Sequence, residues 1–267
     1  MINMDNRRLI KIIFATILVA AIGLLVMRTR VSVAIPTAIG SSSEGIRIVG
    51  IGSSIWGASY EIISQQGTVI IADPAMMGGS VPDADVITVS HRHFDHYDRD
   101  YVERSTGRVS IGMPENFNIK DVHVEGIAAA HGGFFHFWQR NTINPLSPSD
   151  TIYIYDVGGV RIAHLGDLGQ DRLTEDQIRA MGKIDILISK LNNPFITLSC
   201  ESEDKRAFQI IKQINPKVVI PTHTTDRCLI EYSGATNRKL VEYKGTWTTS
   251  REELAQNPPR LVFLKRQ

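Results

Sequence analysis

Short apolar runs separated by glycine and serine dominate the chain once its N-terminal segment has passed. Ile46–Ile51, Ser59–Ser64 and Thr68–Ala72 are rich in β-branched residues, and each has the length and composition of a strand. Turn-forming residues separate these runs, and the third run ends at Asp73-Pro74. The pattern predicts three consecutive strands joined by short turns, which is a meander rather than a β-α-β unit.

Further strands and two helices follow along the chain. Gly158-Gly159 lies between two apolar runs and predicts a tight hairpin. The other predicted strands are Asp85–Ser90, Val109–Ile111, Val122–Ala129, Ile152–Asp156 and Val160–Leu165. Helical periodicity marks Thr174–Met181 and Glu203–Ile214, and each helix precedes a strand, Ile184–Ser189 and Val218–Pro221. The order predicts one α/β domain in which helices cover mixed sheets.

The N-terminal segment has a different character. Ile12–Met27 is a run of sixteen residues without a formal charge, and three basic residues precede it within residues 7–11. Such a segment is typical of a signal peptide or a membrane anchor. Small residues at 32–34 offer a cleavage site, but Arg28 and Arg30 lie where a cleavable segment is usually neutral. These two arginines favour an uncleaved anchor.

Three parts of the chain can therefore be expected. Residues 1–30 form the signal peptide or membrane anchor, residues 31–44 form a serine-containing linker, and residues 45–267 form the folded domain. We expect the protein to be membrane-anchored or exported, with its body outside the cytoplasm. The membrane is then a partner through the N-terminal segment.

The charge balance of the body argues against nucleic acid as a partner. Five of the 29 basic and one of the 28 acidic side chains lie in residues 1–30, which leaves 24 basic and 27 acidic side chains. A surface that binds a phosphate backbone normally carries a clustered excess of Lys and Arg. We therefore expect no nucleic-acid partner.

The two cysteines, Cys200 and Cys228, lie apart in the sequence. Neither stands in a Cys-x-x-Cys spacing, so the pair does not indicate a metal site. Pairing is open to them outside the cytoplasm, but two cysteines do not make a disulfide framework. We expect two separate buried thiols.

The strongest chemical signal is the segment His91-Arg92-His93-Phe94-Asp95-His96, which directly follows the predicted strand Asp85–Ser90. It places three imidazoles and one carboxylate within six residues. Imidazole and carboxylate together suit zinc, manganese or iron. A solvated polar loop is the alternative, and it would not require further donors elsewhere in the chain.

Further donors do follow other predicted strands. They are His131, Asp167 and His223, and each is flanked by small or turn-forming residues that allow close approach to an ion. A single histidine after a strand is more often structural. The combination with the dense histidine segment therefore indicates a metal centre more strongly than any one residue.

This combination resembles the metallo-β-lactamase fold superfamily, whose signature His-x-His-x-Asp-His is matched at every specified position by residues 91–96. The turns Gly166–Gly169 and Pro221–His223 are most similar to the branch that contains ascorbate-6-phosphate lactonase and N-acylphosphatidylethanolamine phospholipase D. The resemblance covers roughly residues 45 to 230. It implies a four-layer αββα sandwich, here preceded by an N-terminal hydrophobic segment.

The resemblance also implies a centre of two divalent metal ions, taken as zinc with manganese or iron as alternatives. A bridging water would ionise near neutral pH in such a centre and attack the substrate. Asp95 and Asp167 are the expected catalytic residues, and Asp95 would also orient the water. Carried over residue by residue, one ion would be held by His91, His93 and His131, the other by Asp95, His96 and His223, with Asp167 bridging the two.

The function implied is a binuclear metal-dependent hydrolase that acts on an ester, a lactone or a phosphodiester. Its substrate would be a small molecule or a lipid. Two alternatives stay open. One is a phospholipase D-like phosphodiesterase acting on a membrane lipid, and the other is a membrane-tethered metal-binding module without turnover.

Several remaining residues have two interpretations. Asp73 and Asp85 stand where acids often brace the ligand loop, but both also suit plain turns. His123 and His164 lie within predicted strands and are expected to be ordinary histidines. The aromatic run Phe134–Trp138 directly follows the segment of the candidate ligand His131, and it could line a substrate pocket or pack as core.

Overall fold

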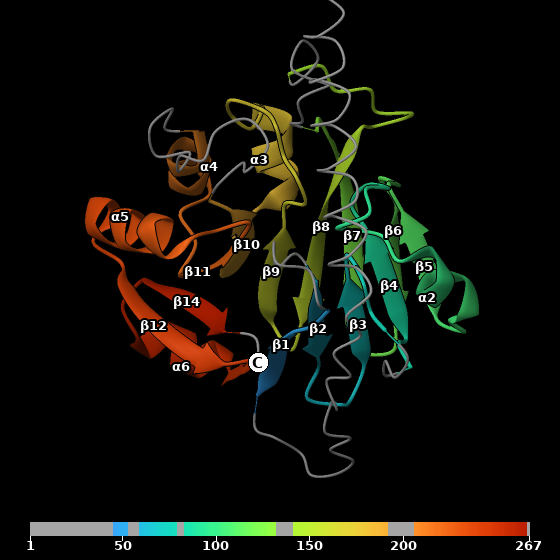
Figure 1. The fold of residues 1–267 in the computed structure, drawn as a ribbon, viewed down its shortest axis with the longest axis horizontal. Coiled ribbons are helices and arrows are strands. Elements are labelled where there is room, and N and C mark those ends of the chain that lie inside the picture. Colours follow the sequence, from blue (N-terminus) through green and yellow to red (C-terminus); the bar gives the residue numbers. More distant parts are fainter. Residues whose placement is uncertain (1–44, 53–58, 79–82, 132–140, 192–205, 266–267) are drawn as a thin grey trace, which may run out of the picture. The chain divides into compact units, whose positions relative to one another are not determined.

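The computed structural model describes most of the folded domain, namely residues 45–52, 59–78, 83–131, 141–191 and 206–265. The chain separates into two units, residues 1–35 and 36–267, and all described residues belong to the second. Figure 1 shows this second unit as two β-sheets with helices beside them.

The first sheet has six strands in the order β13-β1-β2-β3-β4-β5. Strands β1, β2 and β3 pair antiparallel, so the predicted meander is confirmed. Strands β4 and β5 then add parallel to β3. The bounds are β1 Ile46–Gly50, β2 Tyr60–Ile63, β3 Val69–Ala72, β4 Val86–Val89, β5 Arg108–Ile111 and β13 Thr246–Thr249.

The second sheet has eight strands in the order β12-β14-β11-β10-β9-β8-β7-β6. Strands β6 to β9 form an antiparallel half, and β9 to β12 with β14 form a parallel half. The bounds are β6 Asn116–Ile119, β7 Val122–Ala129, β8 Asp150–Val157, β9 Val160–His164, β10 Ile186–Lys190, β11 Val218–Thr222, β12 Lys239–Lys244 and β14 Arg260–Lys265.

The predicted hairpin joins β8 to β9. Val157 pairs with Val160, which leaves Gly158 and Gly159 as a two-residue loop. Their φ angles are 55° and 76°. A tight turn with positive φ at both positions matches the right-handed twist of the strands and favours glycine. The prediction from this glycine pair is therefore confirmed.

Buried side chains form three layers of packing. The central core lies between the sheets and includes Ile48 and Ile62 from the first sheet and Tyr155 and Ile162 from the second. A second cluster joins the outer face of the eight-stranded sheet to three helices, and a third joins the outer face of the six-stranded sheet to one helix (Figure 1). The three helices are α3 Glu175–Met181, α4 Arg206–Ile214 and α5 Asp226–Thr236, and the single helix is α2 Arg99–Arg104. The predicted αββα sandwich is confirmed.

Local signals explain why two of these helices could be predicted. Helix α3 begins with a capping box, in which the Thr174 hydroxyl accepts from the Gln177 backbone and the Gln177 side chain accepts from the Thr174 backbone. Helix α4 buries Ala207, Ile210 and Ile211, which lie on one face. The first residues predicted for α4, 203–205, lie outside the described residues.

Several elements escaped sequence analysis. Strand β12 at the sheet edge has exposed charged residues at three of its six positions and half-buried residues at the other three, so its apolar pattern is weak. Helices α2 and α6 (Arg251–Gln256) have only six residues each, too short for a helical periodicity to show. The sequence pattern predicted no element beyond residue 223, yet this part of the chain contributes α5, α6 and three strands to the domain.

Among the described residues, no helix is long and apolar enough to cross a membrane. The predicted signal peptide or anchor in residues 1–30 and the linker in residues 31–44 both lie outside those residues. Both therefore stay predictions.

The expectation for the cysteines is wrong. Cys228, in the first turn of α5, is buried and takes part in a disulfide bond. The other cysteine of the chain, Cys200, lies outside the described residues. Which cysteines pair is set by tertiary structure, and the spacing in the sequence does not reveal it.

Packing of the central core generates a stability prediction. Ile62→Ala should lower the free energy of unfolding by about 2–5 kcal/mol, because Ile62 is fully buried between the sheets and truncation leaves a cavity. Ile230→Ala is the matched control, since Ile230 is 69% exposed on α5 and should change stability by less than about 0.5 kcal/mol. Chemical denaturation of both variants measures the difference, and equal values would contradict the assigned core.

Candidate metal centre

Four strand ends bring the candidate ligands to one edge of the sandwich. His91 follows β4, His131 follows β7, and Asp167 and His223 follow β9 and β11. Strands β7, β9 and β11 run in the same direction within the second sheet. The carboxyl ends of strands that run together meet at one edge, so the side chains that follow them converge.

The turn before Asp167 depends on a glycine. Gly166 has a φ of 53°, a conformation that residues with a Cβ rarely adopt. A Cβ at this position would also lie 2.6 Å from the Asp150 carboxylate and 2.6 Å from the Ser90 hydroxyl. Because Gly166 has no side chain, the Asp167 turn can lie close to Ser90, which directly precedes the ligand segment, His91–His96.

Seven side chains gather into two groups with one shared member. Within each group, one donor atom per residue lies within 4.8 Å of every other. This division is the one that the family resemblance implied. The first group is His91, His93, His131 and Asp167, and the second is Asp95, His96, Asp167 and His223.

Asp167 faces both groups with different oxygens. Its Oδ2 lies 3.5 Å from Nε2 of His131 in the first group. Its Oδ1 lies 3.5 Å from Nε2 of His223 and 3.7 Å from Nε2 of His96 in the second group. This is the arrangement that a carboxylate needs in order to bridge two ions.

The nitrogen atoms in the centre fit a cation. Nε2 of His96 lies 3.1 Å from Nε2 of His223, and the two rings are stacked. Nε2 of His91 is buried and has no hydrogen-bond partner among the described residues. A buried nitrogen is normally satisfied, so the unpartnered Nε2 of His91 is suited to an ion.

Burial keeps two of these histidines neutral. It lowers the pKa of His91 well below the ordinary value, and the neighbouring charge of His96 adds to this effect. Burial likewise lowers the pKa of His223 to about 4. A neutral imidazole offers a lone pair, so both side chains are in the state that metal binding requires.

The remaining members respond to the opposite charges around them. Burial disfavours the charge on His96, but the carboxylates of Asp73 and Asp167 outweigh burial and raise its pKa to about 9. Burial also disfavours the charge on Asp167, yet His223, Lys190 and His96 hold its pKa well below the ordinary value. The carboxylates around His96 therefore favour positive charge at this position.

One of the two predicted bracing acids does contact the ligand segment. Asp73 is fully buried, and its Oδ2 lies 2.6 Å from both His96 Nδ1 and the Ser90 hydroxyl. For Asp85, which was equally suited to a plain turn, the structure favours that alternative, because it accepts from the backbone of Val69 and from Lys120. Asp85 thus holds β3 to the β6-β7 turn, away from the ligands.

Three polar residues at strand ends were missed. Ser90 contacts Asp73 and His91. Asp150 begins β8 with its Oδ1 3.7 Å from Nδ1 of His91, and burial raises its pKa well above the ordinary value. Lys190 ends β10, is 5% exposed and donates to the backbone carbonyl of Asp167. The sequence signal common to all three is a polar residue at the start of a buried strand or where such a strand ends.

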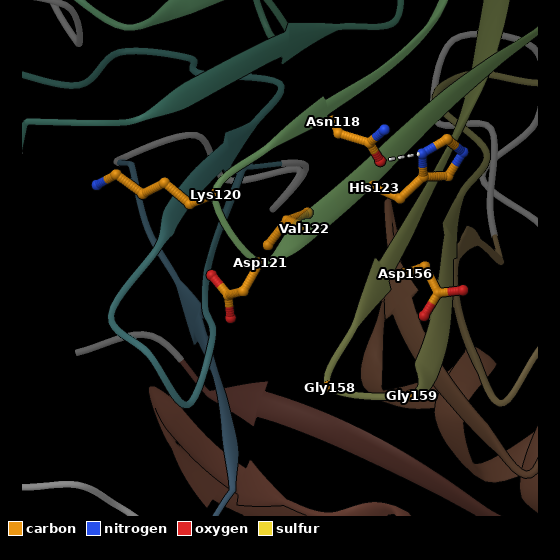
Figure 2. A pocket seen from close by; sticks show the side chains of 8 residues that line it. All are labelled: Asn118, Lys120, Asp121, Val122, His123, Asp156, Gly158 and Gly159. Atoms are coloured by element: carbon orange, nitrogen blue, oxygen red, sulfur yellow. Dashed lines mark hydrogen bonds between the residues drawn. The ribbon is translucent and has the colours of Figure 1, made fainter.

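The two histidines expected to be ordinary belong to neither group. His123 donates to Asn118 beside a shallow groove of about 400 Å³ at the β8-β9 hairpin (Figure 2). His164 is buried with its Nδ1 3.6 Å from Asp73, so it lies directly behind the centre. The aromatic run Phe134–Trp138 falls outside the described residues.

Comparison with known proteins gives one family and several relatives. The family model of the β-lactamase superfamily domain matches residues 54–223. A metal-dependent hydrolase of Anaeromyxobacter dehalogenans is 23% identical over 201 residues, which covers 62% of this chain and 71% of the relative.

Two solved structures share the fold. A Thermotoga maritima protein of the metallo-β-lactamase superfamily is 20% identical with a TM-score of 0.58, and the match covers 83% of this chain and 100% of that one. A metallo hydrolase of Ignicoccus hospitalis is 13% identical with a TM-score of 0.54, and the match covers 76% and 97% of the two chains. At these identities the likeness shows a common fold.

The closed turn at Gly166 leads to a second prediction. Gly166→Ala should destabilise the protein by about 1–3 kcal/mol more than Gly245→Ala, because both glycines have positive φ but only Gly166 would place a Cβ against other atoms. Metal binding should weaken in the first variant only, since the Asp167 turn must move. Denaturation and metal analysis of both variants provide the test. An equal loss of stability in the two variants would mean that the positive φ angle accounts for the whole effect and the contacts of the added Cβ for none of it.

Proposed function

The chain belongs to the β-lactamase superfamily domain family, and from this premise we propose that it is a metal-dependent hydrolase with a binuclear centre. The observation that carries the proposal is the position of Asp167, whose two oxygens face different groups of donors. A single-ion site would not need a carboxylate placed between two sets of histidines. The relative from Anaeromyxobacter dehalogenans bears the name of a metal-dependent hydrolase, which supports the reaction class.

The donor set indicates the ions that the centre would hold. Five imidazoles and two carboxylates make up the two groups, and this mixture suits zinc, with manganese or iron as alternatives. Two such ions would supply Lewis acidity and a hydroxide near neutral pH. The ligands would be His91, His93 and His131 for one ion and Asp95, His96 and His223 for the other, with Asp167 shared.

The chain's own residues would orient the reaction. Asp95 is buried within the second group, and burial raises its pKa. It would accept a hydrogen bond from the attacking water and direct it towards the substrate. Asp167 would hold the two groups at a fixed separation, so that both act on the same substrate atom. These two carboxylates are the proposed catalytic residues.

The bond cleaved would belong to an ester, a lactone or a phosphodiester, and one observation favours the phosphodiester. Lys190 places a buried ammonium 3.3 Å from the backbone oxygen of Asp167. A positive charge beside the centre stabilises the negative charge that develops on a phosphoryl group more than it stabilises a neutral ester. A phospholipase D-like reaction on a membrane lipid is the corresponding second candidate.

A location outside the cytoplasm fits this second candidate. The disulfide bond of Cys228 is of a kind that persists in oxidising compartments and is rare in the cytosol. The apolar run Ile12–Met27 would export the body or anchor it beside the bilayer. An anchored enzyme would meet lipid substrates at high local concentration.

The binuclear centre predicts a metal stoichiometry. The purified full chain should hold about two zinc ions, and His93→Ala should hold about one with the fold retained, because His93 belongs only to the first group. His123→Ala is the matched control, since this histidine lies in neither group, and it should keep both ions. Metal analysis with circular dichroism reports both quantities. One ion per unmutated chain at saturating zinc would refute the binuclear proposal.

Lys190 predicts a substrate preference. The zinc-loaded chain should hydrolyse bis(p-nitrophenyl) phosphate, and Lys190→Met should lower kcat/KM on it about tenfold or more while changing p-nitrophenyl acetate hydrolysis by less than about threefold. Lys190→Arg retains the charge and should keep most of the phosphodiesterase rate. Equal losses of kcat/KM on both substrates would mean that Lys190 only maintains the centre.

Metal binding without turnover on any ester, lactone or phosphodiester would instead favour the metal-binding module.

A further inference from the structure

The Ser90 hydroxyl lies between a buried carboxylate and a ligand histidine. Its Oγ is 2.6 Å from Oδ2 of Asp73 and 3.0 Å from Nδ1 of His91. Ser90 is fully buried, so water does not compete for these contacts. One hydroxyl thus touches two polar groups, and its single proton can serve only one of them.

The distances assign that proton to Asp73. A hydroxyl that donates to a carboxylate typically lies 2.5–2.7 Å away, which is the separation seen here. The same carboxylate accepts from the Ser90 backbone N–H at 2.6 Å and faces Nδ1 of His96 at 2.6 Å. Asp73 therefore accepts from both the backbone and the hydroxyl of Ser90, and its contact with His96 lies on the same oxygen that the hydroxyl contacts.

The proton assignment determines the tautomer of His91. With its proton donated to Asp73, the Ser90 oxygen can only accept, so Nδ1 of His91 must carry a hydrogen. Asp150 Oδ1 lies 3.7 Å from the same nitrogen, which is beyond hydrogen-bond distance. The unprotonated nitrogen is then Nε2, which is buried without a hydrogen-bond partner in the described part of the chain.

We propose that Ser90 is a positioning residue that fixes His91 in the Nδ1–H tautomer and so aims its Nε2 lone pair at the first ion. The hydroxyl also joins the two groups, because Asp73 Oδ2 receives Ser90 on one side and His96 on the other. One ligand of each ion is thereby oriented by the hydrogen-bonded pair of Ser90 Oγ and Asp73 Oδ2. This inference rests on the proposed function, since it assigns a role to Ser90 within the same centre.

The test compares Ser90→Ala with Ser110→Ala in the full chain. Ser110 is also a buried strand serine, and its hydroxyl contacts Tyr153 at 2.9 Å, away from the ligands. Ser110→Ala also removes a buried serine hydroxyl, so it controls for the general cost of losing such a group, although Ser90→Ala loses two hydroxyl contacts and Ser110→Ala loses one. Any difference in histidine chemistry or zinc affinity then belongs to Ser90.

Two measurements give the outcome. Long-range ¹H–¹⁵N spectra of the zinc-free protein should show His91 as the Nδ1–H tautomer in the wild type and in Ser110→Ala, but as a mixture in Ser90→Ala. Titration with zinc alone should show one of the two ions bound about 10–100-fold more weakly in Ser90→Ala, with Ser110→Ala unchanged.

Two results would overturn the proposal. One is a single Nδ1–H tautomer retained in Ser90→Ala, and the other is zinc affinity equal to that of Ser110→Ala. A wild-type chain that binds no zinc would refute the proposed function instead. In that case the tautomer, which is read without any ion, would still decide whether Ser90 orients His91.

Discussion

The ligand arrangement depends on the desolvated carboxylate of Asp73. This side chain is fully buried at the end of β3, with a φ of 48°, and an unpaired buried charge would cost several kcal/mol. Its oxygens are satisfied by Ser90 and His96, which follow β4 in the same sheet, and His164 of the other sheet lies beside them. The hydrogen bonds of Asp73 thereby fix Ser90, just before the ligand segment, and His96, at its end. The contact with His164 places both residues beside the second sheet.

The charges in the centre are arranged to receive positive charge. Two carboxylates, Asp95 and Asp167, share the site with histidines that burial keeps largely neutral, as the lowered pKa of His91 and of His223 shows. Burial disfavours a charge on His96, but the carboxylates of Asp73 and Asp167 outweigh burial and raise its pKa to about 9. The electrostatics and the donor geometry therefore both favour positive charge in the centre.

Prediction from the sequence worked best where local chemistry decides the outcome. The Gly158-Gly159 hairpin needs only positive φ angles, and α3 needs only its Thr174 capping box, so both could be identified from a few residues. The region after residue 223 was harder, because β12 is an edge strand in which exposed charged residues at three of six positions weaken the apolar pattern. The role of Asp85 stayed open in the sequence, because its partner Lys120 is distant in sequence and joins it only in the folded chain.

The sequence by itself determined which chemistry is available, since His91, His93, Asp95 and His96 lie within six residues and their side chains must be near one another. Tertiary structure alone decided the rest. The two oxygens of Asp167 face different groups because Gly166 lets its turn close against Ser90 and Asp150. Lys190 enters the site because β10 pairs between β9 and β11. Contacts of this kind join residues far apart in the chain, and only the packing of the two sheets brings them within reach of one another.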